Sequence, residues 1–399
     1  MLPVNRDAGT IPPAIWALGF VSLLMDVSSE LIHSLLPVFL MTALGVSALT
    51  IGLIEGTAEA TALIVKVFSG VLSDWWGKRK PLALLGYGLG AIAKPLFALA
   101  GGAGMVVAAR LIDRVGKGIR GAPRDALVAD LAPPGIRGAA FGLRQSLDTV
   151  GAFLGPLLAI GLMLACADDF RAVFWVATLP AGLAVALLFF GVREPVGAQV
   201  ARRVNPIRGE NLRRLSGDYW WVVGIGAACT LARFSEAFLI LRAAQGGLPV
   251  ALTPLVLIGM NLIYAASAYP FGKLSDRLSH AGLLAWGLVV LIAADALLAY
   301  SNHWAWVWAG ISLWGLHLGM TQGLLATMVA ATAPADLRGT AYGFFNLVSG
   351  LAMLLASALA GLLWDSAGAP FTFLAGAGFS AMALMAMVVR SARRAQQRP

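Results

Sequence analysis

The sequence of 399 residues is poor in charged side chains, in cysteine and in histidine. Only 12% of its residues are Asp, Glu, Lys or Arg, whereas about 25% is usual in a soluble domain. The two cysteines, Cys166 and Cys229, both lie in apolar runs and are too few for a disulfide framework or a thiolate metal site. The sequence also lacks the phosphate-binding loop of ATP-driven pumps and any nucleophile motif. The composition therefore argues against a soluble protein and against an enzyme, and it gives no reason to expect a metal or a cofactor.

What the sequence does have is long apolar runs. Hydrophobic residues make up 59% of the chain, and the mean hydropathy is +0.81. Runs of about 20 apolar residues recur, which is the length that a helix needs to cross about 30 Å of hydrocarbon. They predict an all-α membrane protein with twelve transmembrane helices, at residues 14–42, 49–73, 81–101, 104–131, 138–166, 172–192, 219–243, 252–274, 282–301, 305–332, 338–364 and 369–390.

The basic residues gather in alternate connections between these runs. The longest connection, residues 193–218, has six arginines, whereas the connections ALGVSA and AAQGGLPV have no charge. Because cytoplasmic loops of membrane proteins are enriched in Lys and Arg, both termini and the long connection are expected in the cytoplasm. These basic cytoplasmic loops of a protein in a lipid bilayer account for the net charge of +9, so no nucleic-acid partner is expected.

The chain repeats itself at a spacing of about 200 residues. GVLSDWWGKRK, which contains Ser73 and Asp74, matches GKLSDRLSHAG at an offset of 202, and APPGIRGAAFG (132–142) matches APADLRGTAYG (333–343) at an offset of 201. Parallel repeats of this kind are typical of transporters with a site at the membrane midplane between the two halves. We expect an N-terminal six-helix bundle at 1–192, a cytoplasmic linker at 193–218 and a C-terminal six-helix bundle at 219–399.

Several motifs resemble the major facilitator superfamily. GVLSDWWGKRK is similar to the family's signature between helices 2 and 3, although Trp75 stands where an arginine is usual. Arg110, in VVAAR, is at the place of the family's helix-4 arginine, and GAFLGP (151–156) is similar to its antiporter signature. DVSSE together with DRVGKGIRGAPRDAL resembles a bacterial branch of the superfamily. The resemblance implies two pseudo-symmetric bundles, a cavity lined by helices 1 and 4 of each half, and a location in the bacterial inner membrane.

The resemblance also implies a cytoplasmic gate. In the family the signature aspartate, here Asp74, holds this gate against helix 11, near Gly339. Residues of the signature and its repeat, and of the second repeated motif with the nearby Asp130, are expected to have this structural role rather than to contact substrate: Gly70, Asp74, Lys78, Arg79, Asp130, Arg137, Asp276, Arg277 and Arg338.

Ionisable residues inside the predicted helices are the candidates for function, because charges in hydrocarbon are costly unless they are paired or face water. Asp26 and Glu30 are four residues apart on helix 1 and share a face, and with Glu59 on helix 2 they are predicted to carry protons. Other polar residues are expected to line the cavity: Arg110, Asp113, Arg114, Lys117, Asp148, Arg233, Glu236, Asn261 and His317. Structural alternatives stay open, since Glu59 with Lys117 or Arg233 with Glu236 could simply form ion pairs between or within helices.

The pattern as a whole predicts a monomeric secondary transporter that works by alternating access. A carboxylate in a low-dielectric site takes up a proton and releases it when a cation approaches, so proton-coupled antiport, with export of a small molecule, is the expected activity. One alternative is a proton symporter that imports an anionic or zwitterionic solute. Another is a membrane sensor that uses the same scaffold without transporting anything.

Overall fold

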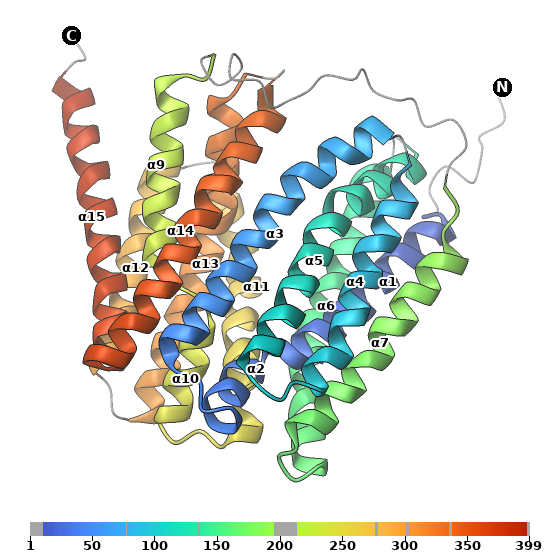
Figure 1. The fold of residues 1–399 in the computed structure, drawn as a ribbon. Coiled ribbons are helices and arrows are strands. Elements are labelled where there is room, and N and C mark those ends of the chain that lie inside the picture. Colours follow the sequence, from blue (N-terminus) through green and yellow to red (C-terminus); the bar gives the residue numbers. More distant parts are fainter. Residues whose placement is uncertain are drawn as a thin grey trace, which may run out of the picture. The chain divides into compact units, whose positions relative to one another are not determined.

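The computed structural model describes residues 11–76, 78–133, 136–194, 214–275, 278–300, 303–334 and 337–396. Every regular element in these ranges is a helix (Figure 1). The N-terminal elements are α1 (Pro13–His33), α2 (Leu36–Val38), a π-helical turn (Phe39–Ala43), α3 (Ala48–Trp76), α4 (Arg79–Ala98), α5 (Ala103–Leu131), α6 (Arg137–Ala165) and α7 (Phe170–Gly191). The C-terminal elements are α9 (Gly217–Ala232), α10 (Ala237–Gln245), a 3₁₀ turn (Val250–Leu252), α11 (Leu255–Ser275), α12 (His280–Tyr300), α13 (Trp304–Thr332), α14 (Arg338–Ala367) and α15 (Ala369–Gln396).

The length and composition of these helices confirm the predicted all-α membrane fold. Within the described residues, ten segments are long and apolar enough to cross a membrane. Helices α5 and α13, each of 29 residues, are not among these ten, and α5 is left out because of its charges. Both correspond to predicted helices, at 104–131 and 305–332. A helix as charged as α5 must face protein or water rather than lipid alone.

Two predicted helices are interrupted, which corrects the ranges 14–42 and 219–243. The first breaks after His33, since Pro37 has no N–H to donate to the His33 carbonyl four residues earlier. The second breaks between α9 and α10, where Ser235 Oγ accepts a hydrogen bond from the Ala237 N–H and Ser357 Oγ accepts one from the Ser235 N–H. Such local side-chain bonds compete with the helical ones.

The described residues divide into two compact units. Unit 1 lies within residues 1–36 and 61–205, and unit 2 lies within 37–60 and 206–399. The first half of α3 belongs to unit 2, where the Asp365 carboxylate at the end of α14 accepts hydrogen bonds from the N–H groups of Ala48 and Leu49, at 3.0 and 2.8 Å.

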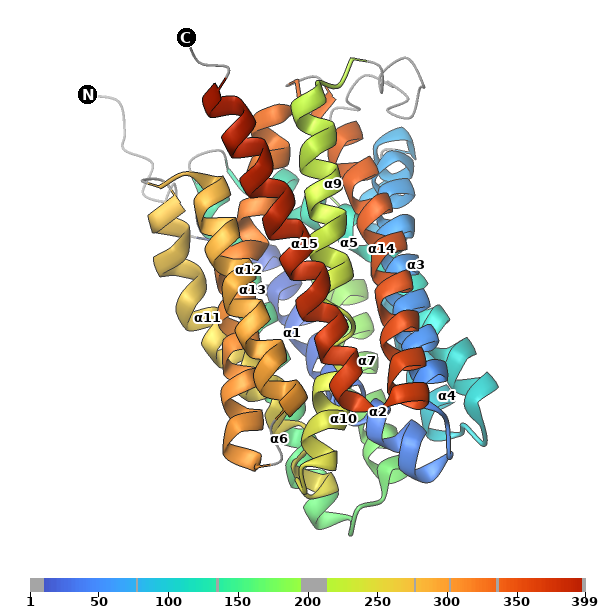
Figure 2. The ribbon, with the colours of Figure 1, turned by 90° about the vertical axis from the view of Figure 1, so that its left-hand side faces the viewer.

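The same helix pairs pack in each unit, as the repeat in the sequence predicts. In unit 1, α4 packs on α5 and α7, and α1 packs on α6 and α7. In unit 2, α12 packs on α13 and α15, and α9 packs on α14 and α15, which run side by side in Figure 2. Each unit therefore repeats one arrangement of helices, and residues at equivalent positions of the two units can be compared directly.

Candidate functional site

A fully buried ion pair joins α4 to α5 in unit 1. Lys94 Nζ lies 2.8 Å from Asp113 Oδ1, and the two side chains are 1% and 4% exposed. The same ammonium group donates a hydrogen bond to Ser29 Oγ of α1, at 3.0 Å. Arg114 Nε lies 3.6 Å from the second oxygen of Asp113. The Asp113 carboxylate thus contacts cations from two helices, α4 and α5, and the Lys94 ammonium links these helices to α1.

A neighbouring bond connects α5 to the end of α1. One terminal nitrogen of the buried Arg110 guanidinium lies 2.8 Å from His33 Nδ1. Since His33 is the last residue of α1 before the break at Pro37, this bond holds α5 at the point where the helix ends.

A second cluster contains acids that are less buried. Asp26 on α1 and Asp148 on α6 are within hydrogen-bonding reach of each other, and their side chains remain 24% and 22% exposed. Three arginines surround them. Arg120 lies 4.0 Å from Asp26 Oδ1, and Arg124 and Arg144 each lie 3.6 Å from Asp148 Oδ1.

The α5 arginines of this cluster are held by further contacts. The Arg120 guanidinium lies 4.8 Å from the centroid of the Tyr87 ring on α4, a cation–π distance. Arg124 bonds to Asp125 at 3.1 Å and to Ser22 Oγ of α1 at 3.3 Å. The arginines are therefore positioned by several helices, while the side chains of Asp26 and Asp148 stay partly exposed.

Two glycines of α6 allow this helix to pack closely against the face of α1 that carries Asp26 and Glu30. A Cβ on Gly151 would lie 2.4 Å from the Leu23 carbonyl oxygen and 3.1 Å from Asp26 Cβ. A Cβ on Gly155 would lie 2.8 Å from Glu30 Cβ and 2.9 Å from the Val27 carbonyl oxygen. Both are glycines of GAFLGP, so this motif sets the distance between α6 and the helix that carries Asp26 and Glu30.

The second cluster thus joins α1, α5 and α6 through contacts between two acids and three arginines. A movement of one of these helices relative to the others would change which of the ion pairs are formed.

The structure brings together some of the predicted N-terminal site residues and separates others. Asp26, Asp148, Arg110, Asp113 and Arg114 all take part in the contacts above. Glu30 lies on α1 against Gly155. Glu59 belongs to unit 2. Lys117 is exposed on α5 and lies within electrostatic range of Asp26, so its role in the cavity stays a prediction.

The predicted residues of unit 2 lie at three places. Arg233 and Glu236 flank the break between α9 and α10. His317 is buried on α13, with Nδ1 2.7 Å from the Gly287 carbonyl oxygen of α12. Asn261 is half-buried on α11. Their role in substrate binding stays a prediction.

The predicted gate residues are only partly described. Arg79 Nε lies 2.9 Å from Asp130 Oδ2, Gly70 packs against Ala122, and Lys78 is exposed just before α4. Two predicted gate residues, Asp276 and Arg277, lie outside the described residues. The side chains of Asp74, Arg137 and Arg338 are not described either.

Sequence reasoning left Lys94, Arg120, Arg124 and Arg144 out of the candidate site. The sequence places Arg110, Arg114, Lys117 and Arg124 on one stripe of this helix. Arg120 is off that stripe, yet it is the arginine that forms an ion pair with Asp26. The available signal was the balance of charge, because every buried acid needs a partner and these four, with Lys66, were the remaining bases of the predicted helices in the first half.

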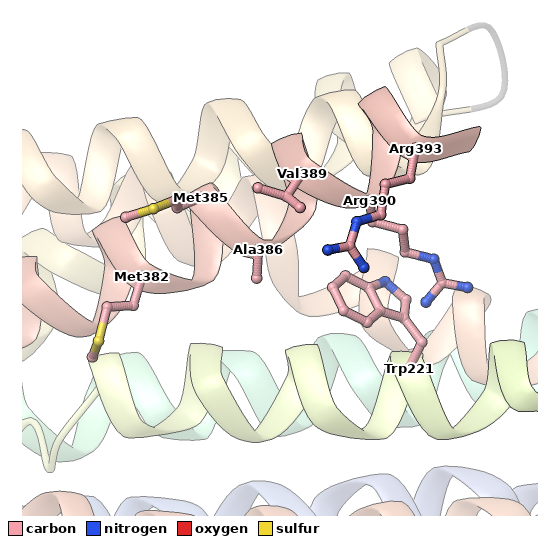
Figure 3. Close-up of a pocket in the computed structure, with 7 residues that line it drawn as sticks. All are labelled: Trp221, Met382, Met385, Ala386, Val389, Arg390 and Arg393. Carbon is pink, nitrogen blue, oxygen red and sulfur yellow. The ribbon is translucent and has the colours of Figure 1, made fainter. Parts of the chain in front are cut away.

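An open groove on unit 2 runs between α9 and α15 (Figure 3). Its lining is mostly apolar, with Met382, Met385 and Val389 along α15. Arg390 stacks on the Trp221 ring at 4.4 Å and pairs with Asp218 at one end. None of the predicted site residues lines the groove, so we do not assign it as the transport site.

Comparison with known proteins identifies the family. Residues 18–241 and 243–399 match the model of the Major Facilitator Superfamily. An uncharacterised MFS-type transporter of Methanocaldococcus jannaschii is 33% identical over 369 residues, which cover 90% of each chain. The multidrug resistance protein MdtH of Yersinia pestis is 24% identical over 360 residues, 87% of this chain and 86% of that one.

A solved structure shows the same fold at low sequence identity. A mutant of the nucleoside transporter NupG has a TM-score of 0.81 at 13% identity, with 94% of this chain and 99% of that chain covered. These findings confirm the resemblance seen in the sequence motifs. The chain belongs to the major facilitator superfamily and is a multi-pass membrane transporter.

Proposed function

We propose that the protein is a proton-coupled antiporter that exports a small molecule from the cytoplasm of a bacterium. The observation that carries this proposal is the Asp26–Asp148 pair, which is partly exposed and surrounded by Arg120, Arg124 and Arg144. The antiporter-like motif packs directly against the helix that carries Asp26. A relative named as a multidrug resistance protein is consistent with export.

In this mechanism the pair takes up a proton on one side of the membrane and releases it on the other. Protonation weakens the attraction between Asp26 and Arg120, and deprotonation restores it, so that proton occupancy favours one arrangement of α1 and α5 over another. Alternating access then moves substrate in the opposite direction. The proposal also includes Glu30 and Glu59 as further proton carriers. It assigns substrate binding to four residues of unit 2: Arg233, Glu236, Asn261 and His317. The monomeric state and the cytoplasmic termini also belong to this proposal.

The proposal is tested in proteoliposomes with a pH-sensitive dye in the lumen. Solutes of several classes (cationic drugs, organic acids, amino acids) are added under an imposed proton gradient. A transported solute should dissipate the gradient with the wild type, and this response should fall to the level of protein-free liposomes with Asp26→Asn, because an amide cannot exchange a proton. Asp168→Asn is the matched control, since Asp168 is exposed in the α6–α7 connection and should leave the flux unchanged.

The sign of the pH change separates antiport from the alternatives. If solute and protons move in the same direction, the protein is a symporter, a reading favoured by the surplus of arginines on α5 that would attract an anion. Solute transport without proton movement in both wild type and Asp26→Asn would refute proton coupling through this pair. If no solute moves at all, the sensor alternative gains support.

A further inference from the structure

Asp295 on α12 occupies the position in unit 2 that Lys94 occupies in unit 1. Asp295 lies 201 residues after Lys94, and Trp314 on α13 lies 201 residues after Asp113, which is the offset of the sequence repeat. In both units a side chain of the first helix bonds to a side chain 19 residues later on the second. The two bonds therefore join equivalent helices, α4 to α5 and α12 to α13.

The charges of the two equivalent bonds differ. In unit 1 the Lys94 ammonium is neutralised by the Asp113 carboxylate. In unit 2 the partner is neutral, since Trp314 Nε1 donates a hydrogen bond to Asp295 Oδ1 at 3.1 Å. Asp295 is 0% exposed, and its second oxygen, Oδ2, is buried without a hydrogen-bond partner. The buried pair of unit 1 thus contains a cation and an anion, whereas the equivalent pair of unit 2 contains one carboxyl group and no cation.

The free oxygen lies at the break between α9 and α10. A Cβ on Gly376 of α15 would lie 2.7 Å from Asp295 Oδ2, 3.1 Å from the Ala232 carbonyl oxygen and 3.1 Å from the Phe234 ring. Oδ2 therefore shares the space in front of Gly376 with the carbonyl end of α9. Ala232 is the last residue of α9, so this carbonyl belongs to the interrupted part of the helix.

The ionisable groups of the surrounding helices interact with partners other than Asp295. Arg242 of α10 donates from Nε to the Leu298 carbonyl oxygen, at 2.8 Å. His317 of α13 bonds to the Gly287 carbonyl oxygen. Arg233, at the end of α9, lies near Glu236 and Cys229, and α15 has no charged residue before Arg390. Within the described residues, no Lys, Arg or His forms an ion pair with Asp295.

We propose that Asp295 is a proton-binding site of unit 2, occupied in this conformation, with its proton on Oδ2 facing the carbonyl end of α9. An ionised carboxylate that is buried without a cation carries a large desolvation cost, which a bound proton removes. The protonated oxygen is also a donor, and the Ala232 carbonyl oxygen is an acceptor beside the same glycine. One carboxylate oxygen and one carbonyl are too few ligands for a Ca²⁺ or Mg²⁺ ion. This site is separate from the Asp26–Asp148 pair and does not depend on its role in transport.

The first test compares the same substitution at the two buried aspartates. Asp295→Asn keeps an acceptor for Trp314 and a donor in place of the proton, so the purified variant should unfold thermally within a few degrees of the wild type. Asp113→Asn removes the charge that neutralises Lys94, and its loss of Tm should be several-fold larger. A clear rise in the Tm of Asp295→Asn above that of the wild type would mean that the substitution had removed an uncompensated buried charge, so that Asp295 is ionised, and would overturn the proposal.

The second test observes the proton directly and does not depend on the stability of a variant. Infrared spectra of wild-type protein in lipid at neutral pH should contain the C=O stretch of a protonated carboxylic acid that is absent from Asp295→Asn and present in Asp26→Asn. The band should shift in deuterated buffer after full exchange. If the wild type minus Asp295→Asn difference spectrum contains carboxylate bands instead, Asp295 is ionised and the proposal is wrong. Because neither test measures transport, they can succeed or fail independently of the antiport proposal.

Discussion

Replacing Asp113 with alanine should destabilise the protein by about 3–5 kcal/mol, because it leaves the Lys94 ammonium buried without a counter-charge. Lys94 is 1% exposed, and its remaining described partner is the Ser29 hydroxyl, which carries no charge. Arg114 would lose its contact with the same carboxylate. The measurement is thermal or denaturant unfolding of purified protein, followed by tryptophan fluorescence at a fixed detergent or lipid concentration.

The double variant Lys94→Met/Asp113→Leu tests whether the loss comes from an unpaired charge. Replacing both partners of a buried ion pair by apolar side chains of similar volume is often close to neutral. The double variant should therefore be more stable than Asp113→Ala alone. If the effects of single substitutions at the two positions simply add in the double variant, then Lys94 and Asp113 do not stabilise each other and the interpretation of this pair is wrong.

Placing a methyl group at Gly151 should disturb both stability and transport. The new Cβ would lie 2.4 Å from the Leu23 carbonyl oxygen, a backbone atom that can move only with α1. Overpacking of this kind costs about 1–3 kcal/mol, and the shift of α1 would carry Asp26 away from Asp148. We expect Gly151→Ala to lower the Tm and to reduce proton-coupled flux in proteoliposomes at equal amounts of inserted protein.

Gly161 provides the matched control on the same helix. It also lies on α6, and a Cβ there would meet nothing within 4 Å. Gly161→Ala should leave flux unchanged and should leave stability unchanged or slightly raised, since alanine favours helix more than glycine does. If Gly151→Ala and Gly161→Ala behave alike, the close contact between α6 and α1 does not position the acids.

The equivalence of Lys94 and Asp295 could be predicted from the sequence, but the surroundings of Asp295 could not. The repeat offset is visible without a structure, and it assigns Lys94 to Asp295 and Asp113 to Trp314 by arithmetic alone. That Asp295 is buried and keeps one oxygen unpaired depends on the packing of α12 against α13, α15 and the end of α9. An apolar run with one acid gives no indication of which neighbour this acid will face.

The breaks in the first and seventh predicted helices show a similar limit. Pro37 could have indicated the first break, because a proline inside a helix removes a hydrogen bond. The break after Ala232 has no proline or glycine, and it depends on Ser357 of α14, which is more than a hundred residues away in sequence. Apolar periodicity recognises a segment that can cross the membrane, but it cannot show where tertiary contacts interrupt the helix.

The sequence by itself determined the helices, the repeat and the presence of charges within the membrane-spanning segments. These properties are local: hydrophobic length, helical spacing and motif offsets depend on residues close to one another in the chain or on direct comparison of its halves. Tertiary structure alone decided the partners, because it paired Asp26 with Arg120, set Asp148 beside Asp26 and joined Lys94 to Asp113. Partners depend on how helices cross and rotate, and a rotation of one residue's angle, about 100°, exchanges the side chain that faces a neighbour.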